Sequence, residues 1–188
     1  MSYVGNVGNA QDLGLILEAA EATRALPIAY VVVGDGIRRV WLEAEVARRA
    51  LTNVLVLGYL PRAETPWVNA SSDICTVLLS PHIQGDGFPS KIFSIMASGR
   101  SAIIAADESS DLRLVAAESH CGRVVPVGRG DLFTEAVLAA FQHPDALAEE
   151  GRRAREWVVA RYSKETIAAA YDGLIGELLG GQAGKRKG

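Results

Sequence analysis

The stretch from residue 74 to residue 105, ICTVLLSPHIQGDGFPSKIFSIMASGRSAIIA, contains the pattern that decides the fold. It begins with an apolar run at Ile74–Leu79, and after a loop it continues as a helical segment at Ser90–Ala97. A glycine stops the helix, and a second apolar run follows at Ser101–Ala105. A strand, a helix and a second strand in this order form a βαβ unit, whose two strands lie parallel in one sheet.

The same alternation extends in both directions from this unit. Further strands are predicted at Ser2–Val7, Ala29–Val33, Val54–Leu57 and Arg123–Pro126. Further helices are predicted at Gln11–Ala25, Ile37–Ala50, Glu64–Ala70, Asp111–Glu118, Leu132–Phe141, Asp145–Tyr162 and Lys164–Leu179. The strands are apolar throughout, which indicates burial on both faces. The prediction is an α/β fold: a doubly wound, Rossmann-like, mostly parallel sheet of about six strands.

Length and composition bound the class of protein. The 188 residues are enough for one globular domain, expected at 1–180, and the Gly-rich end at 181–188 is expected to be a disordered tail. A formal net charge of −3 argues against nucleic acid as a partner. Cys75 and Cys121 lie in or beside apolar runs and are expected to be reduced core thiols of a cytoplasmic protein. The apolar runs are all far shorter than the roughly 20 residues of a membrane span.

In a doubly wound sheet, ligands bind beyond the carboxyl ends of the strands, so the loops that follow the strands are the candidate sites. Gly5, Asn6 and Gly8 form a turn that can present backbone amides to phosphate, although a plain strand-to-helix turn has the same pattern. The loop VVVGDGIRR (31–39) lacks the third glycine of a dinucleotide fingerprint and favours a capping turn.

The loop Gly58-Tyr59-Leu60 offers a close approach at its glycine and an aromatic ring that can stack on a base or simply cover the surface. His82, in the loop after the fourth predicted strand, either lies near a transferred sugar or is ordinary polar surface. The Cys, His and Asp residues show no metal-ligand spacing, so no metal ion is expected.

The segment GDGFPSK (85–91) holds the most informative candidates. Gly87, Phe88 and Pro89 lead into a helix start at which the amides of Ser90 and Lys91, together with the Lys91 charge, suit a diphosphate. Asp86 precedes this start and can accept hydrogen bonds from sugar hydroxyls. The alternative is a capped helix with an acidic first turn.

The ordered series of segments resembles the C-terminal domain of family 4 glycosyltransferases. The resemblance covers Tyr3 to about Leu179, and it is carried by YVGNVGNAQDLGLILEAA, YVVVGDGIRRVWLE, NVLVLGYLP, SSDICTVLLSP, GDGFPSKIFSIMASGRSAI, GRVVPVGRGDLFTEAV and RYSKETIAAAYDGLIGELL. The resemblance implies a GT-B fold, in which this domain holds the nucleotide sugar and an N-terminal domain holds the acceptor. It also implies retention at the anomeric carbon and no required metal.

The family pairs two glutamates separated by seven residues, the first on the donor sugar and the second on the ribose, and these positions correspond to Asp86 and Ser94. Asp86 keeps the carboxylate, whereas Ser94 loses the charge and the bidentate geometry. Asn6 and Gln11 stand where many members carry basic residues, and Lys91 can supply part of the missing charge. Asp86 and Lys91 are therefore the expected catalytic residues.

The expected function is donor binding in a retaining glycosyltransferase that transfers a sugar, with a UDP-sugar as the expected donor, to a glycan or lipid-linked acceptor in cell-surface polysaccharide synthesis. No cofactor is expected. The acceptor domain would lie outside this chain, and any contact with the inner face of the cell membrane would involve that other half. The main alternative, motivated by Ser94, Asn6 and Gln11, is an inactive glycosyltransferase-like domain that acts as a binding or regulatory module. A third possibility is an unrelated flavodoxin-like or dehydrogenase-like domain.

Overall fold

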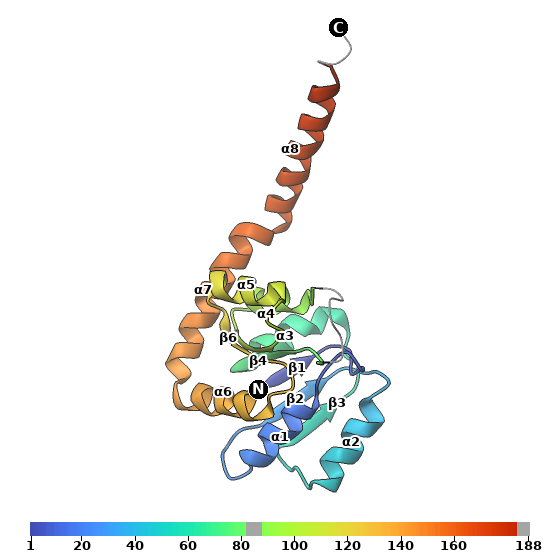
Figure 1. The fold of residues 1–188 in the computed structure, drawn as a ribbon, viewed down its shortest axis with the longest axis vertical. Helices are drawn as coiled ribbons and strands as arrows, with labels where there is room; N and C mark the ends of the chain where they lie inside the picture. Colours follow the sequence, from blue (N-terminus) through green and yellow to red (C-terminus); the bar gives the residue numbers. More distant parts are fainter. Residues whose placement is uncertain (82–87, 184–188) are drawn as a thin grey trace.

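The computed structural model describes residues 1–81 and 88–183 as strands, helices and connecting turns (Figure 1). The strands are β1 Ser2–Val4, β2 Tyr30–Val33, β3 Val54–Leu57, β4 Ile74–Leu78, β5 Ser101–Ala105 and β6 Gly122–Val125. The helices are α1 Gly14–Ala22, α2 Arg39–Arg48, η1 Arg62–Glu64 (a 3₁₀ turn), α3 Thr65–Ala70, α4 Lys91–Ala97, α5 Asp111–Ser119, α6 Gly130–Gln142, α7 Pro144–Tyr162 and α8 Lys164–Ala183. Each predicted element is present, with shifts at its ends. The largest strand shift is at β1, which ends at Val4 because Gly5, at φ 146°, turns the chain out of the sheet.

The six described strands form one parallel sheet in the order β3-β2-β1-β4-β5-β6. This order is that of a doubly wound Rossmann-like fold, which confirms the predicted fold class. The chain winds outward in one direction from β1 to β3 and in the other from β4 to β6. The point of reversal lies between β1 and β4, and in folds of this kind the helices that follow the two strands diverge there and leave a crevice for a ligand.

Two hydrophobic cores cover the two faces of the sheet. Residues of α1, α2 and α6 pack on one face, and residues of α4, α5 and α7 pack on the other. Consecutive residues of β5 divide between them, because Ile103 lies in the first core and Ile104 in the second, both fully buried. Burial on both faces is the predicted cause of the apolar character of such a strand. The prediction is wrong for β3 at the edge of the sheet, because Leu55 and Leu57 are exposed there.

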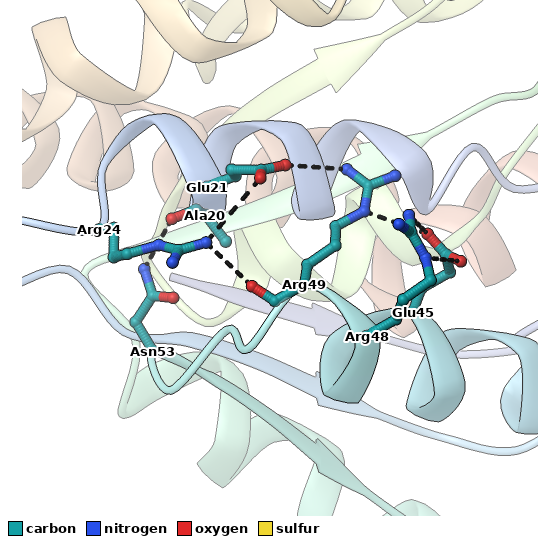
Figure 2. A network of polar contacts seen from close by, with 7 residues as sticks. All are labelled: Ala20, Glu21, Arg24, Glu45, Arg48, Arg49 and Asn53. Carbon is teal, nitrogen blue, oxygen red and sulfur yellow. Dashed lines mark hydrogen bonds and ion pairs between the residues drawn. The ribbon is translucent and has the colours of Figure 1, made fainter.

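A network of charged groups joins α1 to α2 on the surface (Figure 2). The Arg49 guanidinium lies 3.2 Å from a Glu21 oxygen on α1 and 3.1 Å from a Glu45 oxygen on α2. Arg48 reaches the same Glu45 carboxylate at 2.7 Å, and these two arginines lower the pKa of Glu45 to about 2. The Asn53 side-chain amide donates to the Ala20 carbonyl of α1 at 3.0 Å, so the start of β3 is fixed to α1.

Helix α8 extends away from the rest of the molecule, and Figure 1 shows it as a long arm beyond α7. It ends at Ala183, so residues 181–183 of the predicted tail belong to the helix. Six large apolar side chains of α8 are exposed: Ile167, Tyr171, Leu174, Ile175, Leu178 and Leu179. Among the described residues, no helix is both long enough and apolar enough to cross a membrane.

Candidate functional site

Beyond the carboxyl ends of β1 and β2, the loops that follow the two strands run side by side and cross at close distance. The Gly5 amide donates to the Val33 carbonyl at 2.9 Å, and the Val7 amide donates to the Asp35 carbonyl at 2.8 Å. Gly34, at φ 147°, lies so close that a Cβ atom there would overlap the Gly5 carbonyl oxygen. The glycines that the sequence places after both strands are therefore required by this crossing.

The turn after β1 is closed by its own side chains. The Gln11 side-chain oxygen accepts from the Gly8 amide at 3.2 Å and from the Asn6 side-chain amide at 3.5 Å. The amides of Gly5, Val7 and Gly8 thus already have acceptors. Binding of an anion at this turn therefore depends more on nearby positive charge than on backbone amides without acceptors.

A hollow of about 410 Å³ lies at the carboxyl ends of β1, β2 and β3. Of the predicted donor-binding residues, it brings together Gly5, Asn6, Tyr59 and Leu60. The Tyr59 ring is 73% exposed and is therefore accessible to a ligand. The hollow is large enough for part of a small ligand and is mostly apolar with a few polar groups, as ligand sites usually are.

The same hollow includes Arg62, a cationic residue that the sequence analysis did not select. Arg62 opens the 3₁₀ turn η1 after the loop of Tyr59, and nothing in its sequence context distinguishes it from the other surface arginines. Gly58 lies outside the lining, and a Cβ atom on it would be 3.0 Å from the Arg39 guanidinium. Arg39 itself pairs with Glu43 at 2.9 Å and Asp35 at 3.5 Å, so Gly58 leaves room for this ion pair.

Lys91 lies at the point where the strand order reverses. Its Nζ atom is 4.0 Å from the centroid of the Tyr3 ring on β1, and a Cβ atom on Gly5 would be 2.7 Å from Nζ. The lysine at the start of α4 therefore contacts the strand and the turn on the other side of the reversal point. Burial of the ammonium lowers the pKa of Lys91 to about 8, so most of its charge is present at pH 7.

Ser90 and Ser94 lie beside this lysine on the same short helix. Ser90 is the residue before α4, and the Ser94 hydroxyl donates to the Lys91 carbonyl at 2.9 Å. Ser94 and Lys91 line a small cavity of about 40 Å³ between α4, α3 and β4. Because α4 has only seven residues, its dipole is small, and Lys91 supplies most of the positive potential at this position.

Phe88 and Pro89 lead into α4 from the loop after β4. The Phe88 ring stacks on Phe93 at 5.2 Å between centroids, and Phe93 contacts Tyr162 at the end of α7 at 4.5 Å. These aromatic contacts anchor the start of α4 to α7. The predicted site residues His82, Asp86 and Gly87 lie outside the described residues.

The described part of the chain brings no three His, Cys, Asp or Glu side chains together in a group that could hold a metal ion. Cys75 and Cys121 are both buried free thiols, as predicted. Burial raises the pKa of both thiols, which suits core residues and not nucleophiles.

Comparisons with known proteins agree on one class of protein. No family model matches the chain. The chain is 28% identical over 166 residues to WcaI of Escherichia coli K12, which is named as a colanic acid biosynthesis glycosyl transferase, and the match covers 88% of this chain and 40% of WcaI. Its fold superposes on HepE of Anabaena with a TM-score of 0.80 at 16% identity, covering 94% of this chain and 48% of HepE.

A third neighbour is itself an isolated domain. The C-terminal domain of a group 1 glycosyl transferase (LpcC) of Francisella tularensis superposes with a TM-score of 0.69 at 18% identity, and 87% of each chain is covered. The chain therefore has the Rossmann-like fold of these glycosyltransferase domains, and its sequence is similar to that of glycosyltransferases. This domain spans less than half the length of each curated relative that it matches.

Proposed function

We propose that this domain is the nucleotide-sugar-binding half of a retaining, family 4 glycosyltransferase that acts in cell-surface polysaccharide synthesis. The observation that carries the proposal is the placement of Lys91, whose partly buried ammonium lies beside the Gly5 turn at the reversal point of the sheet. A positive charge at this point of a doubly wound fold is suited to the phosphates of a nucleotide.

Different residues bind different parts of the donor. Lys91 binds the diphosphate and stabilises the charge that develops on the leaving nucleotide when the bond to the sugar breaks. The hollow bordered by Tyr59 and Leu60 takes the base, with Arg62 at its wall. From the sequence we assign Asp86 and His82 to the sugar and Ser94 to the ribose, with no metal ion required. UDP is the expected nucleotide, because the HepE structure similar to this domain contains UDP.

The acceptor is expected to bind on a second domain, which the greater length of the relatives makes room for. Helix α8 offers that domain a surface. Ile167, Tyr171, Leu174 and Leu178 recur at spacings of four, three and four, so they form one apolar stripe along an exposed helix. A stripe of this kind indicates a helix that is covered by another part of the protein. We place the whole enzyme in the cytoplasm, with contact to the inner face of the membrane through that second domain.

Two observations favour the alternative, a glycosyltransferase-like domain that binds nucleotide without catalysis. Asn6 and Gln11 occupy the positions of the family's basic residues, and here the Gln11 side-chain oxygen accepts hydrogen bonds from the Asn6 side-chain amide and from the Gly8 amide. Ser94 directs its hydroxyl to its own helix. The two functions share the binding step and differ in turnover by the complete two-domain protein.

The test is a calorimetric titration of the chain with UDP, GDP and ADP. We expect UDP to bind best and Lys91→Ala to weaken its binding by roughly tenfold or more, because a charged contact to phosphate is lost. Lys164→Ala is the matched control, since Lys164 is an exposed lysine on α8 and should leave the affinity unchanged. Absence of binding by all three nucleotides at millimolar concentration would contradict the proposal.

A further inference from the structure

Tyr3 makes two contacts at the reversal point, and it was not among the predicted site residues. The face of its ring lies 4.0 Å from Nζ of Lys91, and its hydroxyl donates to the Asn6 carbonyl at 2.6 Å. The side chain is fully buried in the first core, so its position is set by packing that does not depend on a ligand. One buried side chain therefore touches both the lysine and the turn.

The ring is a neutral partner for the ammonium. An aromatic face attracts a cation without neutralising it, whereas a carboxylate would offset the charge that an incoming phosphate needs. Among the described residues of the neighbouring strands, Tyr3 places its ring and hydroxyl near the Lys91 ammonium, and Cys75 lines a small cavity together with Lys91. Burial raises the pKa of both, so at neutral pH neither carries a negative charge toward the lysine.

The Tyr3 hydroxyl holds the turn that follows β1. Asn6 lies between Gly5, which borders Nζ of Lys91, and the part of the turn closed by Gln11. Because the Tyr3 hydroxyl donates to the Asn6 carbonyl, it fixes the turn one residue away from Gly5, which borders Lys91. The Tyr3 side chain therefore contacts both groups and sets the distance between the Lys91 ammonium and the turn.

We propose that Tyr3 is a positioning residue for the diphosphate, holding the Lys91 ammonium against its ring and the Asn6 turn by its hydroxyl in one fixed geometry. The proposal rests on the proposed function, because it assumes that Lys91 binds the donor phosphates. It assigns a role to a core tyrosine that packing alone would explain only in part.

The experiment compares Tyr3→Phe and Tyr3→Leu by calorimetric titration with UDP. Tyr3→Phe keeps the ring and loses only the bond to the turn, so we expect about a threefold loss of affinity. Tyr3→Leu loses both contacts, and we expect about a tenfold loss. The matched controls are Tyr30→Phe and Tyr30→Leu, because Tyr30 is equally buried on the adjacent strand and bonds Thr23 at 2.7 Å. We expect these controls to bind UDP as the unchanged protein does.

Two further readouts separate positioning from folding. In a Lys91→Met background, the added loss from Tyr3→Leu should fall to that of Tyr3→Phe, since the ring no longer has a cation to hold. In NMR spectra of lysine-labelled protein without nucleotide, the Lys91 Hε signals should be displaced by the ring current, should keep this displacement in Tyr3→Phe, and should lose it in Tyr3→Leu.

Equal losses from Tyr3→Leu with and without Lys91 would overturn the positioning role, as would Hε signals that are the same in both tyrosine variants. The NMR measurement needs no ligand, so it also distinguishes this proposal from the proposed function. The unchanged protein could fail to bind UDP while the Hε displacement is present with Tyr3 or Phe and absent with Leu. That result would support the contact between Tyr3 and Lys91 and contradict the proposed nucleotide binding. Tyr3→Phe is the decisive variant if Tyr3→Leu does not fold, because loss of its Hε displacement contradicts the proposal.

Discussion

The body of the fold, residues 1–162, and helix α8 differ in how far they bury their apolar side chains. In the body, central strand residues such as Ile103 and Ile104 are fully covered by helices of the same chain. On α8, Leu174 and Leu178 remain 51% and 63% exposed. The body therefore buries its central apolar side chains within the chain, whereas the apolar stripe of α8 is left exposed.

The largest expected effect comes from shortening an equivalent side chain in each region. Ile103→Ala removes buried methyl groups from the first core and should lower the free energy of unfolding by about 3 kcal/mol. Leu178→Ala shortens an exposed side chain on a helix in which alanine is favourable, so it should change that free energy by less than about 0.5 kcal/mol. Urea unfolding followed by circular dichroism measures both. Similar losses in the two variants would contradict the proposed difference between body and arm.

The next effect concerns a polar group inside the body. Lys91→Met replaces a partly buried ammonium and should raise the free energy of unfolding at pH 7 by on the order of 1–2 kcal/mol. The pKa of Lys91 is about 8 in the folded protein and 10.5 without burial, so folding releases a proton between these values. The stability of the unchanged protein therefore rises with pH in this window, and the advantage of Lys91→Met shrinks. Unfolding curves from pH 7 to pH 10 measure this trend, and a constant difference would contradict it.

A smaller effect is expected when the stripe on α8 is made polar. Leu174→Glu combined with Leu178→Glu should leave the melting temperature of the body within about 1 °C, because these side chains touch little of it. The same variant should reduce any self-association that the exposed stripe causes at high protein concentration. Sedimentation velocity over a range of concentrations checks this. Unchanged association would show that α8 is not the adhesive surface.

A similarly small effect is expected at the surface network between α1 and α2. Glu45→Gln removes the carboxylate shared by Arg48 and Arg49 and should lower the melting temperature at pH 7 by less than about 2 °C, because exposed ion pairs contribute little. The pKa of Glu45 is about 2 in the folded protein and 4.5 without its arginines. The contribution is therefore present above pH 4.5 and is lost as the pH falls toward 2, so the two proteins should converge in acid. Thermal melts at pH 7 and pH 3 check this, and a difference that grows in acid would contradict it.

The fold was predictable because its signals are local. Each buried strand is an apolar run ended by a glycine or polar turn, and helical spacing between the runs implies parallel crossovers. The structure brings only some of the predicted site residues together. Gly5, Asn6, Tyr59 and Leu60 converge on one hollow as the loop rule requires, but Gly58 faces an arginine, and Asp86 and His82 lie outside the described residues.

What the sequence could not show are contacts between residues far apart along the chain. Tyr3 is an ordinary strand residue by its pattern, and only the pairing of β1 with β4 brings it against Lys91. The direction of α8 was equally inaccessible, because an apolar stripe predicts a covered helix without saying whether the cover belongs to the same chain.

The crossing of the two glycine turns limits which positions can vary when such domains acquire new donors. Gly34 and Gly36 are held against the backbone of Gly5 and Val7, so any side chain at either glycine would push the turns apart. Tyr59 and Arg62 border the same hollow from the surface, where replacements have space. A library that aims to change nucleotide preference should therefore randomise the loop after β3 and leave the crossed turns intact.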